Sequence, residues 1–256
     1  MNDEKNKTSS FVEHFTELRS RLIKSFVYLF VFFIVCYFFA ENIYNFLLSP
    51  YAEAVKDDQV NRRMIFTALH ETFITYLKVA FFAAIFITSP IILTQVWKFV
   101  APGLYKNEKK ALLPYLIATP TLFLFGAMLV YYLIMPLAIK FFLSFETSTQ
   151  MTTLPIQLEA KVNEYLSLIM RLIFAFGISF QLPVLLSLLA RVGFIDSEYL
   201  KKRRKYVVVI IFAVAAILTP PDPITQIGLG IPLLILYELS ILSVKIIEKK
   251  KEKADA

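Results

Sequence analysis

Two carboxylates stand among basic residues in the polar segments of this sequence, where a cationic group can be bound. Glu17 lies shortly before the first long apolar stretch, and Glu108 lies between the second and third. A partly desolvated carboxylate can hold a guanidinium strongly through charge-assisted, bidentate hydrogen bonds. The alternative is local pairing, in which Glu17 contacts Arg21 four residues later and Glu108 compensates Lys109 or Lys110. The residues alone favour local pairing and leave both interpretations open.

Polar side chains inside the apolar stretches are few, and most of them are amides. They are Gln95, Gln181 and Gln226, with Glu238 near the end of the last stretch. Polar groups in hydrocarbon usually face protein or water, so the deepest one, Gln181, can hydrogen-bond another helix. We find no Asp, Glu or His near the middle of any stretch, which argues against a proton-coupled carrier or a cation channel. No Walker loop, nucleophile elbow or HExxH motif is present, so we do not expect an enzyme.

Six apolar stretches must position these side chains. The chain is 57% hydrophobic and only 18% charged, and about 20 apolar residues cross a bilayer as a helix. The sequence therefore predicts an all-α membrane protein with six transmembrane helices. We place the spans at about 22–42, 73–96, 113–139, 164–190, 207–219 and 224–243.

Lysines and arginines are distributed unequally between the polar segments. Twenty of the 27 fall in the N-terminal tail, the loops after spans two and four, and the C-terminal tail. Only five fall in the other three loops. By the positive-inside rule, both termini are cytoplasmic. The net charge of +7 is thus explained by topology, and we expect no nucleic-acid partner.

The remaining composition predicts one domain without a metal or other cofactor. The single Cys36 and the two histidines are too few for a disulfide or a metal site. We expect a single domain over residues 1–245 and a charged, disordered tail over 246–256, with short helices in 43–72 and 140–163. Asp196 has the position of a helix N-cap.

Prolines are frequent inside the predicted spans. They are Pro90, Pro114, Pro120, Pro136, Pro183 and Pro232. Each removes a backbone hydrogen bond and can kink its helix, so we expect a kinked and concave bundle.

The sequence resembles the TatC family, the multispanning receptors of the twin-arginine protein translocase, from about residue 11 to 245. The resemblance rests on Glu17-Leu18-Arg19-x-Arg21-Leu22, Pro50, Ser89-Pro90-Ile91-Ile92-Leu93-x-Gln95-Val96-Trp97-x-Phe99-x-Ala101-Pro102-x-Leu104-Tyr105-x-x-Glu108, Phe176-Gly177-x-Ser179-Phe180-Gln181-x-Pro183-Val184, Lys202-x-Arg204-x-Tyr206 and Leu218-Thr219-Pro220-Pro221-Asp222. It implies a glove-like bundle in a bacterial plasma membrane, which self-associates in a multi-subunit complex. Such a protein binds twin-arginine signal peptides at the cytoplasmic face. With single-span TatA- and TatB-type partners it moves folded proteins by the protonmotive force, without a cofactor.

The resemblance also assigns roles to individual residues. Glu17, Glu108, Arg19 and Phe99 would form the signal-peptide site. Gln181, Thr219 and Gln226 would dock the single-span partners, and Pro50 and Asp222 would serve translocation or assembly at the outer face. Some relatives have Glu at the position of Gln181, which here cannot carry a charge.

Two other functions compete with the translocase receptor. A small-molecule or ion transporter is disfavoured because mid-membrane ionisable residues and internal repeats are absent from the sequence. A membrane scaffold without a ligand would keep its function when Glu17 and Glu108 are replaced.

Overall fold

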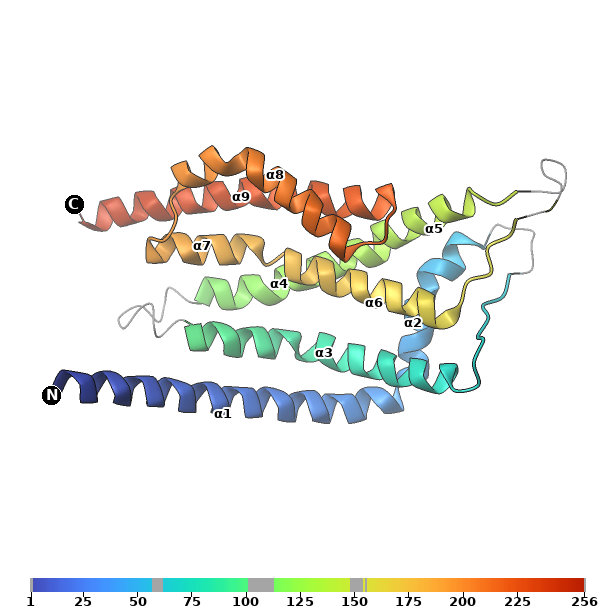
Figure 1. The fold of residues 1–256 in the computed structure, drawn as a ribbon, viewed down its shortest axis with the longest axis horizontal. Helices are drawn as coiled ribbons and strands as arrows, with labels where there is room; N and C mark the ends of the chain where they lie inside the picture. Colours follow the sequence, from blue (N-terminus) through green and yellow to red (C-terminus); the bar gives the residue numbers. More distant parts are fainter. Residues whose placement is uncertain (1, 57–61, 101–112, 148–153, 155, 256) are drawn as a thin grey trace. The chain divides into compact units, whose positions relative to one another are not determined.

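The described part of the chain is helical, with no β-strand and two isolated β-bridges. The computed structural model describes residues 2–56, 62–100, 113–147, 154 and 156–255. Its helices, of which Figure 1 labels α1 to α9, are α1 (Asn2–Phe38), α2 (Ala40–Ala54), α3 (Glu71–Val100), α4 (Leu113–Leu129), the π-helix η3 (Val130–Ile134), α5 (Met135–Leu143), α6 (Val162–Ser179), α7 (Leu182–Val192), α8 (Ser197–Leu218) and α9 (Pro223–Asp255). The all-α prediction is confirmed.

Five described segments are long and apolar enough to cross a membrane. They are Thr16–Phe38, Glu71–Val96, Pro114–Leu143, Val162–Val192 and Pro223–Lys249. The remaining predicted span, 207–219, covers the second half of α8 and the residue after it, behind the basic run 201–205. This apolar half rises only about 20 Å, short of the roughly 30 Å of a bilayer core. The count of six spans therefore stays a prediction.

Three predicted spans are interrupted or end early. The first helix ends at Phe38, and α2 begins at Ala40, so α2 starts within the predicted span 22–42. The third continues through the π-helix into α5, where Pro136 lies in the first turn. The fourth breaks at residues 180–181, because Pro183 in the first turn of α7 has no N–H to continue α6.

The C-terminal end also differs from its prediction. Helix α9 continues through the charged segment as far as Asp255, where we expected a disordered tail over 246–256. Lys and Glu are good helix formers, and the apolar part of α9 supplies the nucleus that a free tail would lack.

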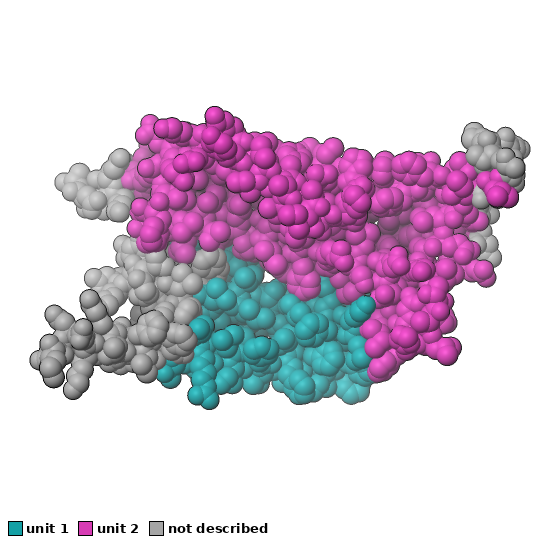
Figure 2. Space-filling view, in the orientation of Figure 1, with its two compact units in different colours: residues 1–43, 76–120 teal, residues 44–75, 121–256 magenta. Residues whose placement is uncertain are grey.

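The described chain forms two compact units, coloured separately in Figure 2. The first contains residues 1–43 and 76–120, and the second contains 44–75 and 121–256. In the first unit, α1 and α3 lie side by side (Figure 1) around a core of small residues: Cys36, Ala40, Ala80, Ala83 and Ala84. Small side chains let two helices approach closely in a membrane. The prediction of a single domain is not tested by this division.

In the second unit, α7 and α8 pack along α9, and α4 contacts α6 through two glycines. A Cβ on Gly126 would lie 2.9 Å from the Phe176 carbonyl oxygen, and one on Gly177 would lie 2.6 Å from the Phe123 ring. Each glycine therefore faces the other helix so closely that a larger residue would force its neighbour to shift.

Candidate functional site

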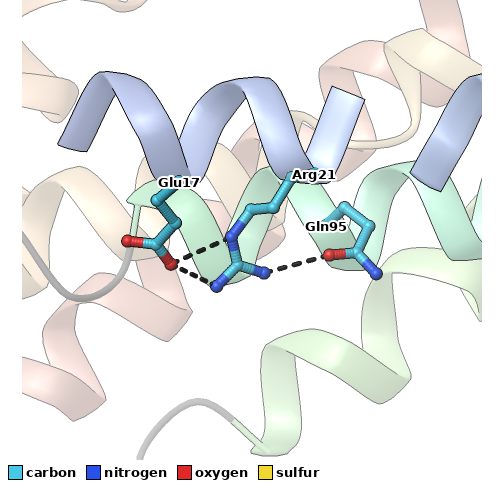
Figure 3. A network of polar contacts seen from close by, with 3 residues as sticks. All are labelled: Glu17, Arg21 and Gln95. Atoms are coloured by element: carbon cyan, nitrogen blue, oxygen red, sulfur yellow. Dashed lines mark hydrogen bonds and ion pairs between the residues drawn. The ribbon is translucent and has the colours of Figure 1, made fainter. Parts of the chain in front are cut away.

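Glu17 accepts two hydrogen bonds from Arg21, one turn later in α1. The Arg21 Nε and Nη2 atoms lie 3.0 and 2.5 Å from the same carboxylate oxygen, Oε1 (Figure 3). The side chain of Glu17 is 38% exposed and that of Arg21 is 22% exposed. The local pairing that the residues favoured is therefore present.

Gln95 completes this contact from the other helix of the first unit. Its side-chain Oε1 accepts a hydrogen bond from Arg21 Nη1 at 3.0 Å, so Figure 3 shows one guanidinium between a carboxylate and an amide. The sequence identified Gln95 as an intramembrane polar residue but gave no partner for it, since 74 residues separate it from Arg21. Within the described part of the chain, both hydrogen bonds of the Glu17 carboxylate go to Oε1, so its other oxygen can accept from a ligand.

The other residues predicted for this site are placed less completely. Arg19 lies on α1 with an exposed side chain. Phe99 lies in the last turn of α3, and its side chain is not among those that the structure describes. Glu108 lies outside the described residues. The structure therefore joins Glu17 to Arg21 and Gln95, and the contribution of Glu108 stays a prediction.

Three residues predicted for partner docking or the outer face meet at the α8–α9 turn. Thr219 ends α8 and donates its hydroxyl to the Ala215 carbonyl at 2.9 Å. Asp222 precedes α9 and accepts 2.7 and 2.5 Å hydrogen bonds from the N–H and hydroxyl of Thr225. Both Thr219 and Asp222 are buried, whereas Gln226 is half-buried. Asp222 is thus a helix N-cap followed by proline, an arrangement that fixes the turn.

Gln181 occupies the break between α6 and α7. The side-chain Nε2 of Gln181 lies 3.5 Å from the Gly177 carbonyl oxygen. The backbone carbonyl of Gln181 accepts a hydrogen bond from the Leu185 N–H at 3.0 Å. An amide at a helix break lies near backbone groups that lack regular helical partners. The structure thus shows local contacts for Gln181 and does not test a partner.

Pro50 is buried inside α2, where it has no N–H to bond the Phe46 carbonyl one turn earlier. The Tyr131 hydroxyl donates to that carbonyl at 2.7 Å, and the Phe46 and Tyr131 rings stack with centroids 4.5 Å apart. Because Pro50 cannot donate to it, the Phe46 carbonyl can accept from Tyr131 instead. This hydrogen bond links α2 to the segment leading into α5.

One further cluster lies outside the membrane segments. Arg62 donates from both terminal nitrogens to Glu146, each at 2.7 Å, and the Leu158 N–H donates to Glu146 at 2.7 Å. These bonds hold the pKa of the Glu146 carboxyl below its ordinary value, Arg62 contributing most. Sequence reasoning missed this pair because 84 residues separate its members.

Comparison with known proteins places this chain in a family. The family model of the Sec-independent protein translocase protein TatC matches residues 13–232. The chain belongs to the TatC family. TatC of Magnetococcus marinus is 46% identical over 256 residues, covering 100% of this chain and 91% of that protein. TatC of Rickettsia prowazekii is 45% identical over 242 residues, covering 94% and 95%.

A solved TatC structure agrees with the fold as well as the sequence. A crystal structure described as the twin-arginine translocase receptor TatC has a TM-score of 0.77 and 34% identity, covering 92% of this chain and 99% of that one. The TatC resemblance is confirmed, and the chain is a membrane component of a Sec-independent protein translocase that works with other subunits.

Proposed function

We propose that this TatC-family chain is the receptor that binds twin-arginine signal peptides at the cytoplasmic face of a bacterial plasma membrane. With TatA- and TatB-type single-span partners, it then moves folded proteins across that membrane by the protonmotive force. The single observation that carries the proposal is the Arg21 guanidinium held by Glu17 and Gln95. The same groups suit an arginine of an incoming peptide.

The geometry supports a mechanism in which a peptide arginine joins or replaces Arg21 as the partner of Glu17. A peptide guanidinium can take the other oxygen of Glu17 or displace Arg21 from Oε1. Either route keeps the partly desolvated carboxylate of Glu17 paired, and an unpaired carboxylate there would be costly. Arginine has five donors in a planar fork, whereas the ammonium of lysine is a strongly hydrated point charge. The site therefore favours arginine.

Partner docking is proposed at Gln181 and at the α8–α9 turn. Gln226 is half-buried and can reach an incoming helix, whereas Thr219 and Asp222 are engaged within the turn and would act by fixing its shape. Pro50 would act in the same indirect way, through the contact between Tyr131 and α2. A hydrogen bond from Gln181 to a polar residue of a partner requires no ionisation.

The test is binding of the solubilised protein to a signal peptide with two arginines, beside the same peptide with two lysines. We expect selective binding of the arginine form. Glu17→Gln should weaken it by about 10- to 100-fold, the size of a lost hydrogen bond to a charged group, and Glu108→Gln should act similarly. Equal binding of both peptides by folded protein would overturn the receptor assignment.

A matched control uses another carboxylate that pairs with an arginine. Glu238 accepts from Arg204 at 2.6 Å and lies in α9, outside the proposed site. Glu238→Gln should leave peptide affinity unchanged. Arg21→Gln separates two roles: tighter peptide binding means that Arg21 competes for Glu17, and weaker binding means that it positions Glu17.

A further inference from the structure

We propose that the second unit binds one phospholipid with an amine-bearing headgroup, in a pocket between α2, α5 and α6. The pocket has a volume of about 390 Å³. Met135, Ala138, Ile139 and Phe142 form its first wall and follow one face of α5, since they are spaced by three and four residues. Tyr51 of α2 and Tyr165 and Leu168 of α6 form the opposite walls.

The walls are fixed by hydrogen bonds that do not involve a ligand. The Tyr165 hydroxyl donates to the Leu47 carbonyl of α2 at 3.1 Å. The backbone of Ile65 forms two hydrogen bonds with the start of α6 and the residues before it. Its carbonyl accepts from the Val162 N–H at 3.0 Å, and its N–H donates to the Ala160 carbonyl at 3.1 Å. The pocket is therefore formed before anything enters it, as ligand sites usually are.

The position of the pocket along the membrane normal indicates an amphipathic occupant. One apolar span ends at Leu143 and the next begins at Val162, so Phe142 and Lys161 mark the membrane surface. Met135 lies two helical turns deeper than Phe142, about 10 Å into the hydrocarbon. A ligand that fills the pocket thus has a polar end at the surface and an apolar end inside.

The size of the pocket favours an acyl chain over a helix. The deep end of the pocket is nearly closed, since Met135 and Ala138 are 1% and 0% exposed, so only a slender group such as part of one acyl chain can reach it. An acyl chain is thinner, and the walls at Met135 and Ala138 are apolar. A transmembrane helix of a partner, about 10–12 Å wide with its side chains, is too wide for this deep end.

The charges at the rim select the headgroup. Lys161 lies between two carboxylates that also line the pocket, Glu159 and Glu164, and its Nζ is 3.9 Å from Glu164 Oε1. Lys161 and Glu164 have side chains 42% and 74% exposed, so this pair can open toward a ligand. One ammonium suits a phosphate, and two carboxylates suit an amine. Phosphatidylethanolamine matches both, whereas phosphatidylglycerol adds a net negative charge beside the carboxylates.

The experiment is native mass spectrometry of the full chain after delipidation. Phosphatidylethanolamine and phosphatidylglycerol with identical acyl chains are added separately. We expect one bound phosphatidylethanolamine per chain, preferred about fivefold, the effect of an exposed ion pair. Equal retention of both lipids would overturn the headgroup assignment.

Variants test the two ends of the site. Glu159→Lys should reverse the headgroup preference, and Ala138→Phe should abolish retention by filling the apolar end. Lys140→Glu changes an exposed charge on α5 that does not line the pocket, and it should leave lipid binding unchanged. An unaltered headgroup preference in Glu159→Lys would mean that the lipid binds elsewhere. Unlike Ala138→Phe, this substitution does not change the packing of buried residues.

Discussion

At the scale of single residues, Arg62 and Glu146 form the most completely satisfied ion pair outside the membrane segments described here. Arg62 has only 6% of its side chain exposed and Glu146 has 21%, and a backbone N–H adds a third hydrogen bond to the carboxylate. Removing one partner of this half-buried pair leaves the other charge partly desolvated and without its partner, which is costly. The pair therefore fixes the segment between α5 and α6 against the segment before α3.

We predict that this contact makes stability dependent on acid. Because the folded-state pKa of Glu146 is lowered, its stabilisation is complete above the ordinary glutamate pKa of about 4.3 and is lost as pH falls through the folded-state value. Glu146→Gln should lower the free energy of unfolding at pH 7 by about 2–3 kcal/mol. It should also remove this part of the acid dependence.

Thermal unfolding in detergent between pH 7 and pH 3 measures both effects. Glu41→Gln is the control, because Glu41 is an exposed carboxylate of α2. An equal loss of stability in the two variants at pH 7, with the acid dependence unchanged, would contradict the role given to Glu146.

At the scale of elements, the reciprocal contact between α4 and α6 sets how closely these helices approach. Gly177 of α6 faces the ring of Phe123, which is only 2% exposed, and a Cβ at residue 177 would lie 2.6 Å from that ring. Gly177→Ala should therefore destabilise the protein by about 1–3 kcal/mol through overpacking.

A second substitution distinguishes this clash from a change in helix flexibility. Phe123→Leu shortens the opposing side chain and should be more damaging in the wild type than in the Gly177→Ala background. The measurement is a double-mutant cycle of thermal stability. Additive effects would show that the two residues do not meet as the structure has them.

Elements whose signals are local could be predicted from the sequence, and contacts between distant segments could not. Asp196 was expected as an N-cap, and its carboxylate accepts from the Tyr199 N–H at 2.5 Å. Pro183 was expected to disturb its helix, and it lies in the first turn of α7, directly after the break at residues 180–181. The partner of Glu17 lies four residues away and was therefore foreseen, whereas Gln95 and Glu146 have partners that only the packed fold brings near.

At the scale of the whole molecule, α8 joins a basic segment and an apolar segment in one helix. Residues 201–205 are five consecutive lysines and arginines with exposed side chains, and the part of the helix that follows them is apolar up to Leu218. Such a basic run resists transfer across the membrane and interacts favourably with anionic lipid. Only the second half of α8 can enter the hydrocarbon, and it matches the bilayer by thinning it or by being shielded by neighbours.

This arrangement predicts that the α8–α9 turn reaches the outer surface and that the end of α9 returns to the cytoplasm. In a Cys36→Ser background, Pro221→Cys places a thiol at the exposed turn, and Lys249→Cys places one near the C-terminus. An impermeant maleimide added to intact cells, or to spheroplasts where an outer membrane is present, should label Pro221→Cys and reach Lys249→Cys only after permeabilisation. Labelling of Lys249→Cys alone would mean five spans and an external C-terminus. The charge distribution opposes that result, because it would place the last five lysines on the outer face.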